Sequence, residues 1–311
     1  LPTGFTGECT GAAGAASTVT ITGPSAYTGD IYVGGNGTIV NQLATTGDVS
    51  GLNLGNISYP TYANTELAGF SNRANVGSVS LGTGTFDNSA TIGSAGLART
   101  AVTLSTTKGF AFSNSGAILN SGNAPAVWLY GSTTGNSTLA NSGTITGGLS
   151  ASIAAAAGTT VDIANSGSIT SYSVPYYIFD PTTYTYRTVS ASYAMQISAS
   201  GAKRLMLANS GTISGNIVLD GTDVTLTNTG TITGNITTGT GNDVIALNGA
   251  LSGSIEGGSG TNTLSINGGT RNAPVALTSV SNIATLTQNG GFATVSGTGT
   301  FGSVALTGGQ L

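Results

Sequence analysis

A short uncharged phrase, Asn-(Ser/Thr)-Gly-x-Ile, recurs along this chain of 311 residues and limits the folds open to it. Full copies begin at Asn114, Asn141, Asn165, Asn209 and Asn228, and a weaker copy begins at Asn88. Neighbouring copies are 19 to 27 residues apart, except for one gap of 44 that holds either a degraded copy or an inserted loop. A period of this length predicts a solenoid, in which each repeat stacks on the one before.

Apolar residues keep a fixed register to the phrase. One lies two positions before the Asn, as in Leu139 and Leu207, and one lies four positions after it, as in Ile145 and Ile213. Further upstream lie two short alternating runs, "AVWLYGS" and "AMQISAS", at equal distances from their Asn: Val127 and Met195 each stand fourteen residues before it. Each repeat therefore carries about three short strands, which bury their apolar sides only by stacking. The pattern predicts an all-β fold, a parallel β-helix with about three strands per turn.

The phrase itself is expected at a corner, where the chain passes from one strand to the next. Its Gly would supply a positive φ at a tight turn, and its Asn tolerates the left-handed region. Repetition lets identical corners stack on one another. The predicted structural corner residues are Asn114, Asn141, Asn165, Asn209 and Asn228, and they are expected to form a ladder between turns.

The regular pattern covers residues 86–311, and residues 1–85 are predicted to form a less regular β region or cap. Residues 171–193, "SYSVPYYIFDPTTYTYRTVSASY", interrupt the repeat as an inserted loop rich in Tyr. Loops that leave a solenoid often carry function, and clustered Tyr binds sugars or protein surfaces at small entropic cost. The candidate contact residues are Tyr176, Tyr177, Tyr184, Tyr186 and Arg187. The alternative is that the insertion lies flat over an apolar patch.

The single Trp is a further candidate contact residue. Trp128 lies between Val127 and Leu129, two positions predicted to face the interior. Strict alternation places Trp128 on the outer face, whereas a bulge would return it to the core.

Charge is scarce, since 7 Lys plus Arg, 11 Asp plus Glu and no His give a net charge of −4. Without a basic stripe, nucleic acid is excluded as a partner. No apolar run approaches the roughly 20 residues that span a bilayer, so no transmembrane segment is expected. The one Cys, Cys9, is expected to be a free thiol or an intermolecular link. The start at Leu1 indicates a removed secretory leader or a trimmed chain.

Several segments, "NSGTITG", "NSGSIT", "NTGTITGNITTGTGNDVIALNGALSGSIEGGSGTNTLSINGG" and "GTGTFGSVALTGG", carry a family resemblance. They resemble the passenger domains of bacterial autotransporters, secreted by the type V route, and related large surface β-helix proteins of Gram-negative bacteria. The resemblance covers roughly residues 110–311. It implies a right-handed parallel β-helix that is exported, displayed or shed, and that in many cases adheres to or aggregates cells.

Two further segments, "TGTGNDVIA" at 238–246 and "GGSGTNTLS" at 257–265, look like the calcium-binding nonapeptide Gly-Gly-x-Gly-x-Asp. Thr238 replaces a Gly in the first copy, and Asn262 replaces the Asp in the second. Because of these two departures, Asp243 is expected at an ordinary β-helix corner, and a calcium site is the alternative. No other cofactor is expected.

Catalysis is not expected, although polysaccharide lyases and hydrolases share the parallel β-helix. Those reactions need paired carboxylates, or a base with Arg or Lys and calcium. Acidic residues here are scattered singly, apart from Asp220 and Asp223. Without His or a second Cys, a Ser-His triad and the usual zinc site are unavailable. A β-helical polysaccharide-degrading enzyme is the alternative function.

Together these features predict a secreted structural or adhesive protein at the surface of a Gram-negative bacterium. It would assemble with copies of itself into a filament or layer, because low charge weakens mutual repulsion. Almost equally, it would adhere to a glycan or protein of another cell or of a matrix.

Overall fold

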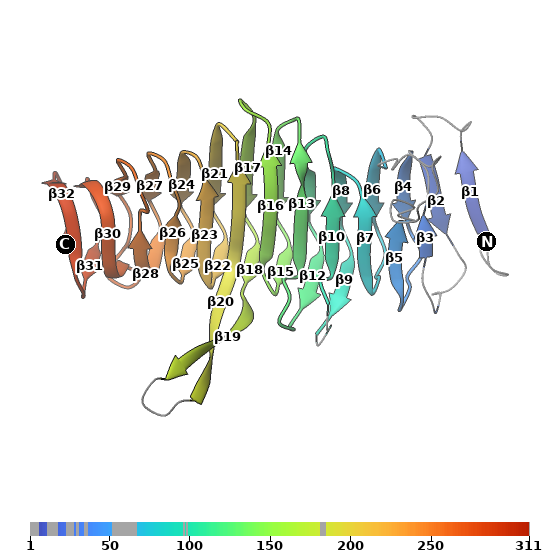
Figure 1. The fold of residues 1–311 in the computed structure, drawn as a ribbon, viewed down its shortest axis with the longest axis horizontal. Helices are drawn as coiled ribbons and strands as arrows, with labels where there is room; N and C mark the ends of the chain where they lie inside the picture. Colours follow the sequence, from blue (N-terminus) through green and yellow to red (C-terminus); the bar gives the residue numbers. More distant parts are fainter. Residues whose placement is uncertain are drawn as a thin grey trace.

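The protein forms a parallel β-helix in this computed structural model (Figure 1), which describes residues 6–10, 18–22, 28, 31–33, 37–51, 67–95, 97, 99–180 and 185–310. The described residues contain strands and no helix, so the predicted all-β fold is confirmed. Consequently no described helix is long and apolar enough to cross a membrane.

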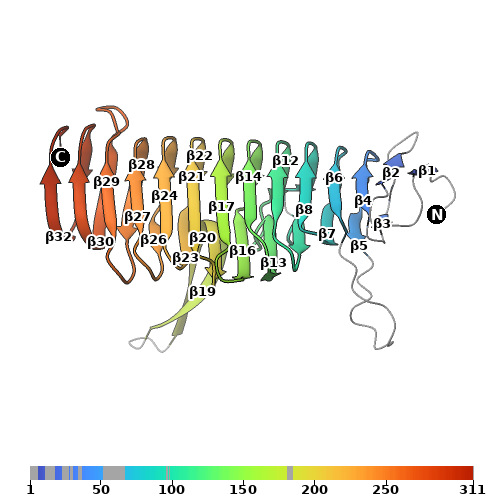
Figure 2. The same ribbon diagram turned by 90° about the horizontal axis from the view of Figure 1, so that it is seen from above.

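Between residues 85 and 238 each turn contributes one strand to each of three faces, and along every face successive turns pair in parallel (Figures 1 and 2). The first face contains β3 (Ile31–Val33), β5 (Asp48–Gly51), β7 (Ser78–Gly82), β10 (Val102–Ser105), β13 (Val127–Thr133), β16 (Leu149–Ala155), β20 (Thr185–Ser200), β23 (Asn216–Gly221) and β26 (Ile236–Thr238). The second face contains β2 (Thr18–Thr22), β4 (Thr38–Asn41), β6 (Gly69–Asn72), β8 (Thr85–Asn88), β11 (Ala111–Asn114), β14 (Ser137–Asn141), β17 (Thr160–Asn165), β21 (Arg204–Asn209), β24 (Val224–Asn228), β27 (Val244–Leu247) and β29 (Thr263–Ile266). The third face contains β9 (Thr91–Ser94), β12 (Ala117–Asn120), β15 (Thr144–Thr146), β18 (Ser168–Thr170), β22 (Thr212–Ser214) and β25 (Thr231–Thr233).

Longer strands near the C-terminal end pass from one face to the next. They are β28 (Ala250–Glu256), β30 (Val275–Gln288) and β32 (Gly299–Leu306), and the short β31 (Ala293–Val295) pairs with β30. At the other end, β1 (Thr6–Thr10) pairs antiparallel with β2, with Cys9 opposite Val19. Strands β4 and β6 continue the second face into β8, and the boundary at residue 85 stays a prediction.

Columns of apolar side chains fill the interior. On the second face Phe70, Phe86 and Phe112 stack with ring centroids 6.0 and 5.2 Å apart, and Leu139 continues their column. On the third face the Ile of each repeated phrase is fully buried, namely Ile118, Ile145, Ile169, Ile213 and Ile232. Each such burial stabilises the fold by about 1.5–3 kcal/mol. The phrase therefore supplies one core residue per turn.

Each strand of the second face from β4 to β24 ends in an Asn whose side chain is buried. Every Nδ2 donates to the Oδ1 of the Asn in the next turn at 2.8 to 3.0 Å, from Asn41 through Asn72, Asn88, Asn114, Asn141, Asn165 and Asn209 to Asn228. The predicted ladder is thus confirmed, and Asn41 and Asn72 extend it. It ends at Asn228 because Leu247 takes the equivalent place in the next turn.

The expected reason for the Gly of the phrase is wrong. Gly143 and Gly167 do not have positive φ, which occurs instead at positions such as Gly147, with φ 102°. A Cβ on Gly167 would lie 2.0 Å from the carbonyl oxygen of Gly143 in the preceding turn. The phrase needs Gly because the corners of successive turns stack too closely for any side chain.

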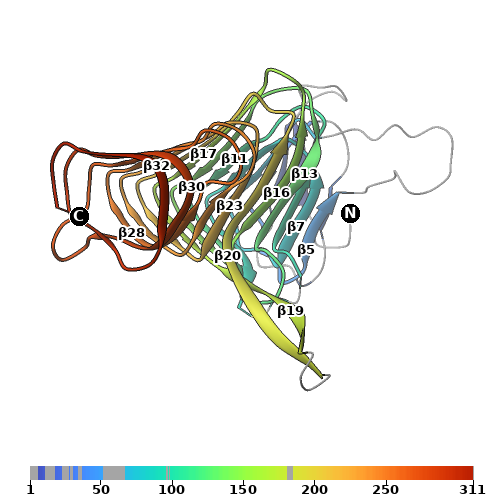
Figure 3. The same cartoon turned by 60° about the vertical axis from the view of Figure 1, so that its left-hand side comes forward.

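The gap of 44 residues is a single turn with an insertion. Asn165 bonds directly to Asn209, and β18 pairs with β22, so no degraded copy lies between them. The insertion is a β-hairpin of β19 (Tyr172–Asp180) and the first part of β20, paired antiparallel from Tyr172 opposite Tyr193 to Asp180 opposite Thr185. Its strands project away from the rod rather than lying along it (Figures 1 and 3).

Candidate functional site

The projecting hairpin carries most of the predicted contact residues. Tyr176 and Tyr177 lie on β19, and Tyr186 and Arg187 lie on β20, opposite Phe179 and Ile178 respectively. Tyr184 lies outside the described residues. The hairpin enters the first face through β20, which pairs with β16 on one side and β23 on the other.

Trp128 lies on the same face, two strands from β20. Its side chain is 43% exposed, so alternation on β13 holds and the alternative of a core Trp is wrong. Tyr130 is 38% exposed and packs against Trp128, with ring centroids 4.9 Å apart and planes tilted by 35°. Sequence reasoning missed Tyr130, although its place two residues after Trp128 puts it on the same side of the strand.

Small polar residues flank the aromatic pair. Thr103 and Ser105 of β10 lie beside Trp128 and Tyr130 on one side. Ser150 and Ser152 of β16 lie beside them on the other. The next strand, β20, places Gln196 beside Ser150. The two rings therefore rise above neighbours that are shorter and carry hydroxyl groups.

Gln196 is fixed by the base of the hairpin. The buried Tyr172, the first residue of β19, donates a hydrogen bond from its hydroxyl to Gln196 Oε1 at 2.7 Å. Burial raises the pKa of Tyr172, so its hydroxyl stays protonated and able to donate. This bond fixes which side of the Gln196 amide faces Tyr172. The other side carries Nε2, which has no hydrogen-bond partner among the described residues.

Asp243 lies elsewhere, at a corner leading into the second face, and is fully buried. Its Oδ1 accepts from the Val224 amide at 2.9 Å, and its own amide donates to Asn262 Oδ1 at 2.9 Å. Burial raises the pKa of Asp243, an effect that Thr238 and the Val224 amide oppose in part. Asp243 Oδ2 and Thr238 Oγ1 are buried without a well-formed hydrogen bond among the described residues.

This geometry makes Asp243 and Asn262 equivalent corner residues of successive turns. Asn262 Nδ2 donates to the carbonyls of Gly257 and Asn282, a role that an ionised carboxylate cannot take. Within the described part of the chain, no group of three or more Cys, Asp or Glu residues could hold a metal ion. The calcium site at Asp243 stays a prediction.

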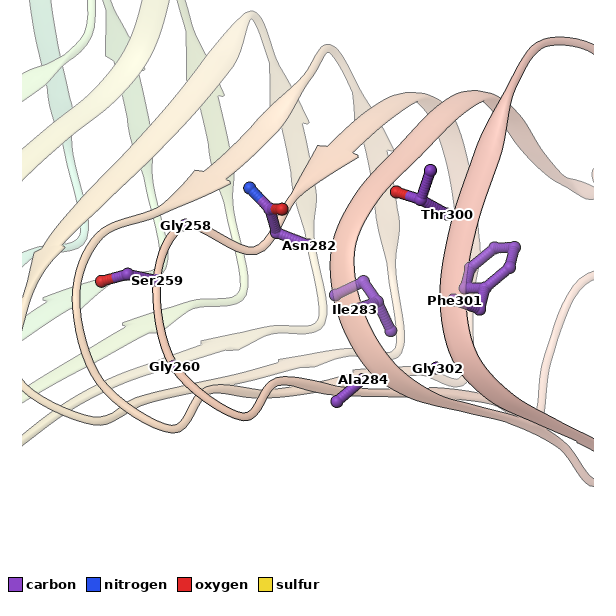
Figure 4. Close-up of a pocket in the computed structure, with 9 residues that line it drawn as sticks. All are labelled: Gly258, Ser259, Gly260, Asn282, Ile283, Ala284, Thr300, Phe301 and Gly302. Carbon is purple, nitrogen blue, oxygen red and sulfur yellow. The ribbon is translucent and has the colours of Figure 1, made fainter.

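A hollow of about 480 Å³ lies near the C-terminal end, where corner lengths change (Figure 4). The corner between Gly257 and Asn262 stacks on a shorter one between Ser281 and Ala284, so the longer corner stands out beside it. Gly258, Ser259 and Gly260 form one side of the hollow, and Phe301 forms part of the other. Its lining contains no charged residue.

The shorter corner depends on Glu256. Asn282 has φ 55°, and among the described residues it alone takes a positive φ without being Gly. Ser281 and Asn282 both donate side-chain hydrogen bonds to the Glu256 carboxylate. These bonds, chiefly that from Ser281, hold the pKa of Glu256 below its ordinary value. Glu256 therefore links two turns, and its carboxylate oxygens are already engaged in holding the corner.

The structure thus brings the aromatic pair and the base of the hairpin to one face, and it places Asp243 at a corner between other strands. Asp220 is exposed on β23, and Asp223 accepts from the Asn242 amide at 2.9 Å. Comparison with protein-family models, with curated proteins and with solved structures finds no match to this chain.

Proposed function

We propose that this protein is an extracellular structural and adhesive β-helix at a bacterial surface. Its rod positions the projecting hairpin and the neighbouring exposed rings, which make the contact with another cell or a matrix. The observation that carries the proposal is the hairpin itself, a Tyr-rich insertion that leaves the rod at the face of Trp128 and Tyr130. The resemblance to autotransporter passengers supports it, as does the scarcity of charge.

The chain supplies its own design for a variant without the hairpin. Thr146 and Leu149 pair with Thr170 and Met195 one turn later, and two glycines, Gly147 and Gly148, join them in the earlier turn. Replacing residues 171–194 by Gly-Gly would close the later turn in the same way. The rod should then stay folded, which circular dichroism and thermal unfolding would verify.

The test compares beads coated with the intact and the hairpin-free protein. Intact protein should make beads clump or adhere to cultured cells or to matrix-coated glass, and the hairpin-free protein should lose most of that adhesion. Equal adhesion by both proteins, or no adhesion by the intact one, would contradict the proposal.

Self-assembly is a second candidate function, favoured by β32. Val304 and Leu306 are 50% and 58% exposed, whereas their partners in the preceding turn, Leu286 and Gln288, are buried. A further turn stacked on β32 would cover them. A second copy of the chain could provide that turn.

A further inference from the structure

The outer surface around Trp128 combines exposed rings with unpartnered polar groups. We define the aromatic face as Trp128, Tyr130, Ser150, Ser152 and Gln196. Among the residues whose side-chain burial the structure describes, its two rings are the only aromatic side chains in the set of large exposed hydrophobic ones. Trp128 Nε1, Tyr130 Oη and Gln196 Nε2 have no hydrogen-bond partner among the described residues. The face thus offers ring surfaces and hydrogen-bonding groups side by side.

The aromatic face is also uncharged. No Lys, Arg, Asp or Glu lies on β10, β13 or β16, or on residues 195–200 of β20. A nucleic acid or an anionic glycan would meet no cation there, and a lipid surface would meet mostly hydroxyl groups. A neutral ligand with both apolar and hydroxyl surface matches it best.

We propose that the aromatic face binds a neutral polysaccharide, whose sugar rings stack on Trp128 and Tyr130. This inference rests on the proposed adhesive function and names the ligand class of its contact surface. The C–H side of a pyranose ring is weakly positive and packs on the negative face of an aromatic ring. The hydroxyl groups of the sugar lie at the rim of its ring, where Ser152 and the Gln196 amide can bond to them.

The spacing of the strands suits an extended sugar chain. Strands β13 and β20 are separated only by β16, which puts them about 10 Å apart. Tyr172 lies against Ser150 and Gln196, whereas Ser152 is exposed beside Tyr130. A sugar on the two rings would therefore lie over Ser152, next to the Tyr172 hydroxyl and Gln196. Trp and Tyr lose little conformational entropy on binding, so they act as rigid anchors.

The single Trp of the chain provides a direct reporter, because Trp128 is the only source of Trp fluorescence. The experiment titrates purified full-length protein with cellohexaose, maltohexaose, mannohexaose and chitohexaose up to millimolar concentration. At least one of them should change the fluorescence in a saturable way. Tyr130→Ala keeps the reporter and should weaken that binding about tenfold or more.

Two further variants complete the test. Trp128→Ala should abolish the binding measured by calorimetry, and Trp128→Phe, which keeps a ring, should retain part of it. Val244→Ala is the matched control, because Val244 is 45% exposed on β27 of another face and should leave the affinity unchanged.

Three results would overturn the inference. The first is no saturable fluorescence change with any of the four sugars, and the second is an unchanged affinity in Tyr130→Ala. The third is a fluorescence change that follows protein concentration without sugar, which would assign the aromatic face to contact between copies. If the sugar titration fails but bead adhesion still depends on the hairpin, only the glycan inference is lost. Sugar binding without bead adhesion would remove the proposed function and leave the binding site.

Discussion

A single residue, Asp243, occupies a place that suits an amide better than a carboxylate. One turn later the equivalent residue is Asn262, whose Nδ2 donates to two carbonyl groups. Asp243 Oδ2 is a donor only when it is protonated. Burial disfavours the ionised carboxylate and so raises the pKa of Asp243, and the nearby Asp223 adds a smaller effect in the same direction.

The sign of the resulting pH dependence follows from the raised pKa. The folded state favours the protonated acid, so the stabilisation is fully present below the ordinary pKa of Asp and is lost as the pH rises through the folded pKa. Asp243→Asn should remove this loss and increase the free energy of unfolding near neutral pH by about 1–2 kcal/mol. Thermal unfolding at about pH 4 and at neutral pH measures both effects.

Asp220→Asn is the control for this change, because Asp220 is exposed and should alter stability little at either pH. Lower stability of Asp243→Asn at neutral pH would mean that the ionised carboxylate is needed in the fold. That result would favour the calcium prediction over the corner role.

At the scale of the element, the Asn ladder gives a comparison between its middle and its end. Asn165 accepts from Asn141 and donates to Asn209, whereas Asn228 accepts from Asn209 and is followed by Leu247. Asn165→Leu would leave the buried Asn209 Oδ1 without a donor. Asn228→Leu would leave Asn209 Nδ2 with two other carbonyl acceptors, those of Gly211 and Thr231.

We therefore expect Asn165→Leu to destabilise the protein more than Asn228→Leu does, by about 1–2 kcal/mol, because an unsatisfied buried acceptor costs more than a shared donor. Urea unfolding of the two variants measures the difference. Equal losses would mean that bonds along the ladder contribute nothing beyond the local carbonyl contacts of each Asn.

The Asn ladder and the columns of apolar side chains could be predicted because every turn repeats the same residue types at the same positions. An apolar residue, a buried Asn and an Ile recur at fixed offsets, so register alone identified Asn114 through Asn228. Asn41 and Asn72 were missed because Gln42 and Arg73 replace the Ser or Thr that follows Asn in the phrase. The need for Gly was misassigned because carbonyl contacts between turns are invisible in a single repeat.

The contact surface was harder to predict, since its parts come from different turns. Alternation on β13 indicated an exposed Trp128, and composition singled out the hairpin. Their position on a common face depends on the pairing of β13 with β16 and of β16 with β20. That pairing required the gap of 44 residues to be one turn, which the sequence left open.

At the scale of the whole molecule, the proposed self-assembly places the contact between copies at β32. Val304 and Leu306 are exposed on β32, and a low net charge opposes contact between copies weakly. Purified protein should therefore form longer rods or filaments as its concentration rises, seen by negative-stain electron microscopy. Val304→Lys with Leu306→Lys should keep the rods short, because charges on an edge strand block pairing, whereas Val244→Lys, away from the edge, should not. Short isolated rods of the unmodified protein at every concentration would exclude self-assembly through β32 and leave adhesion as the function to test.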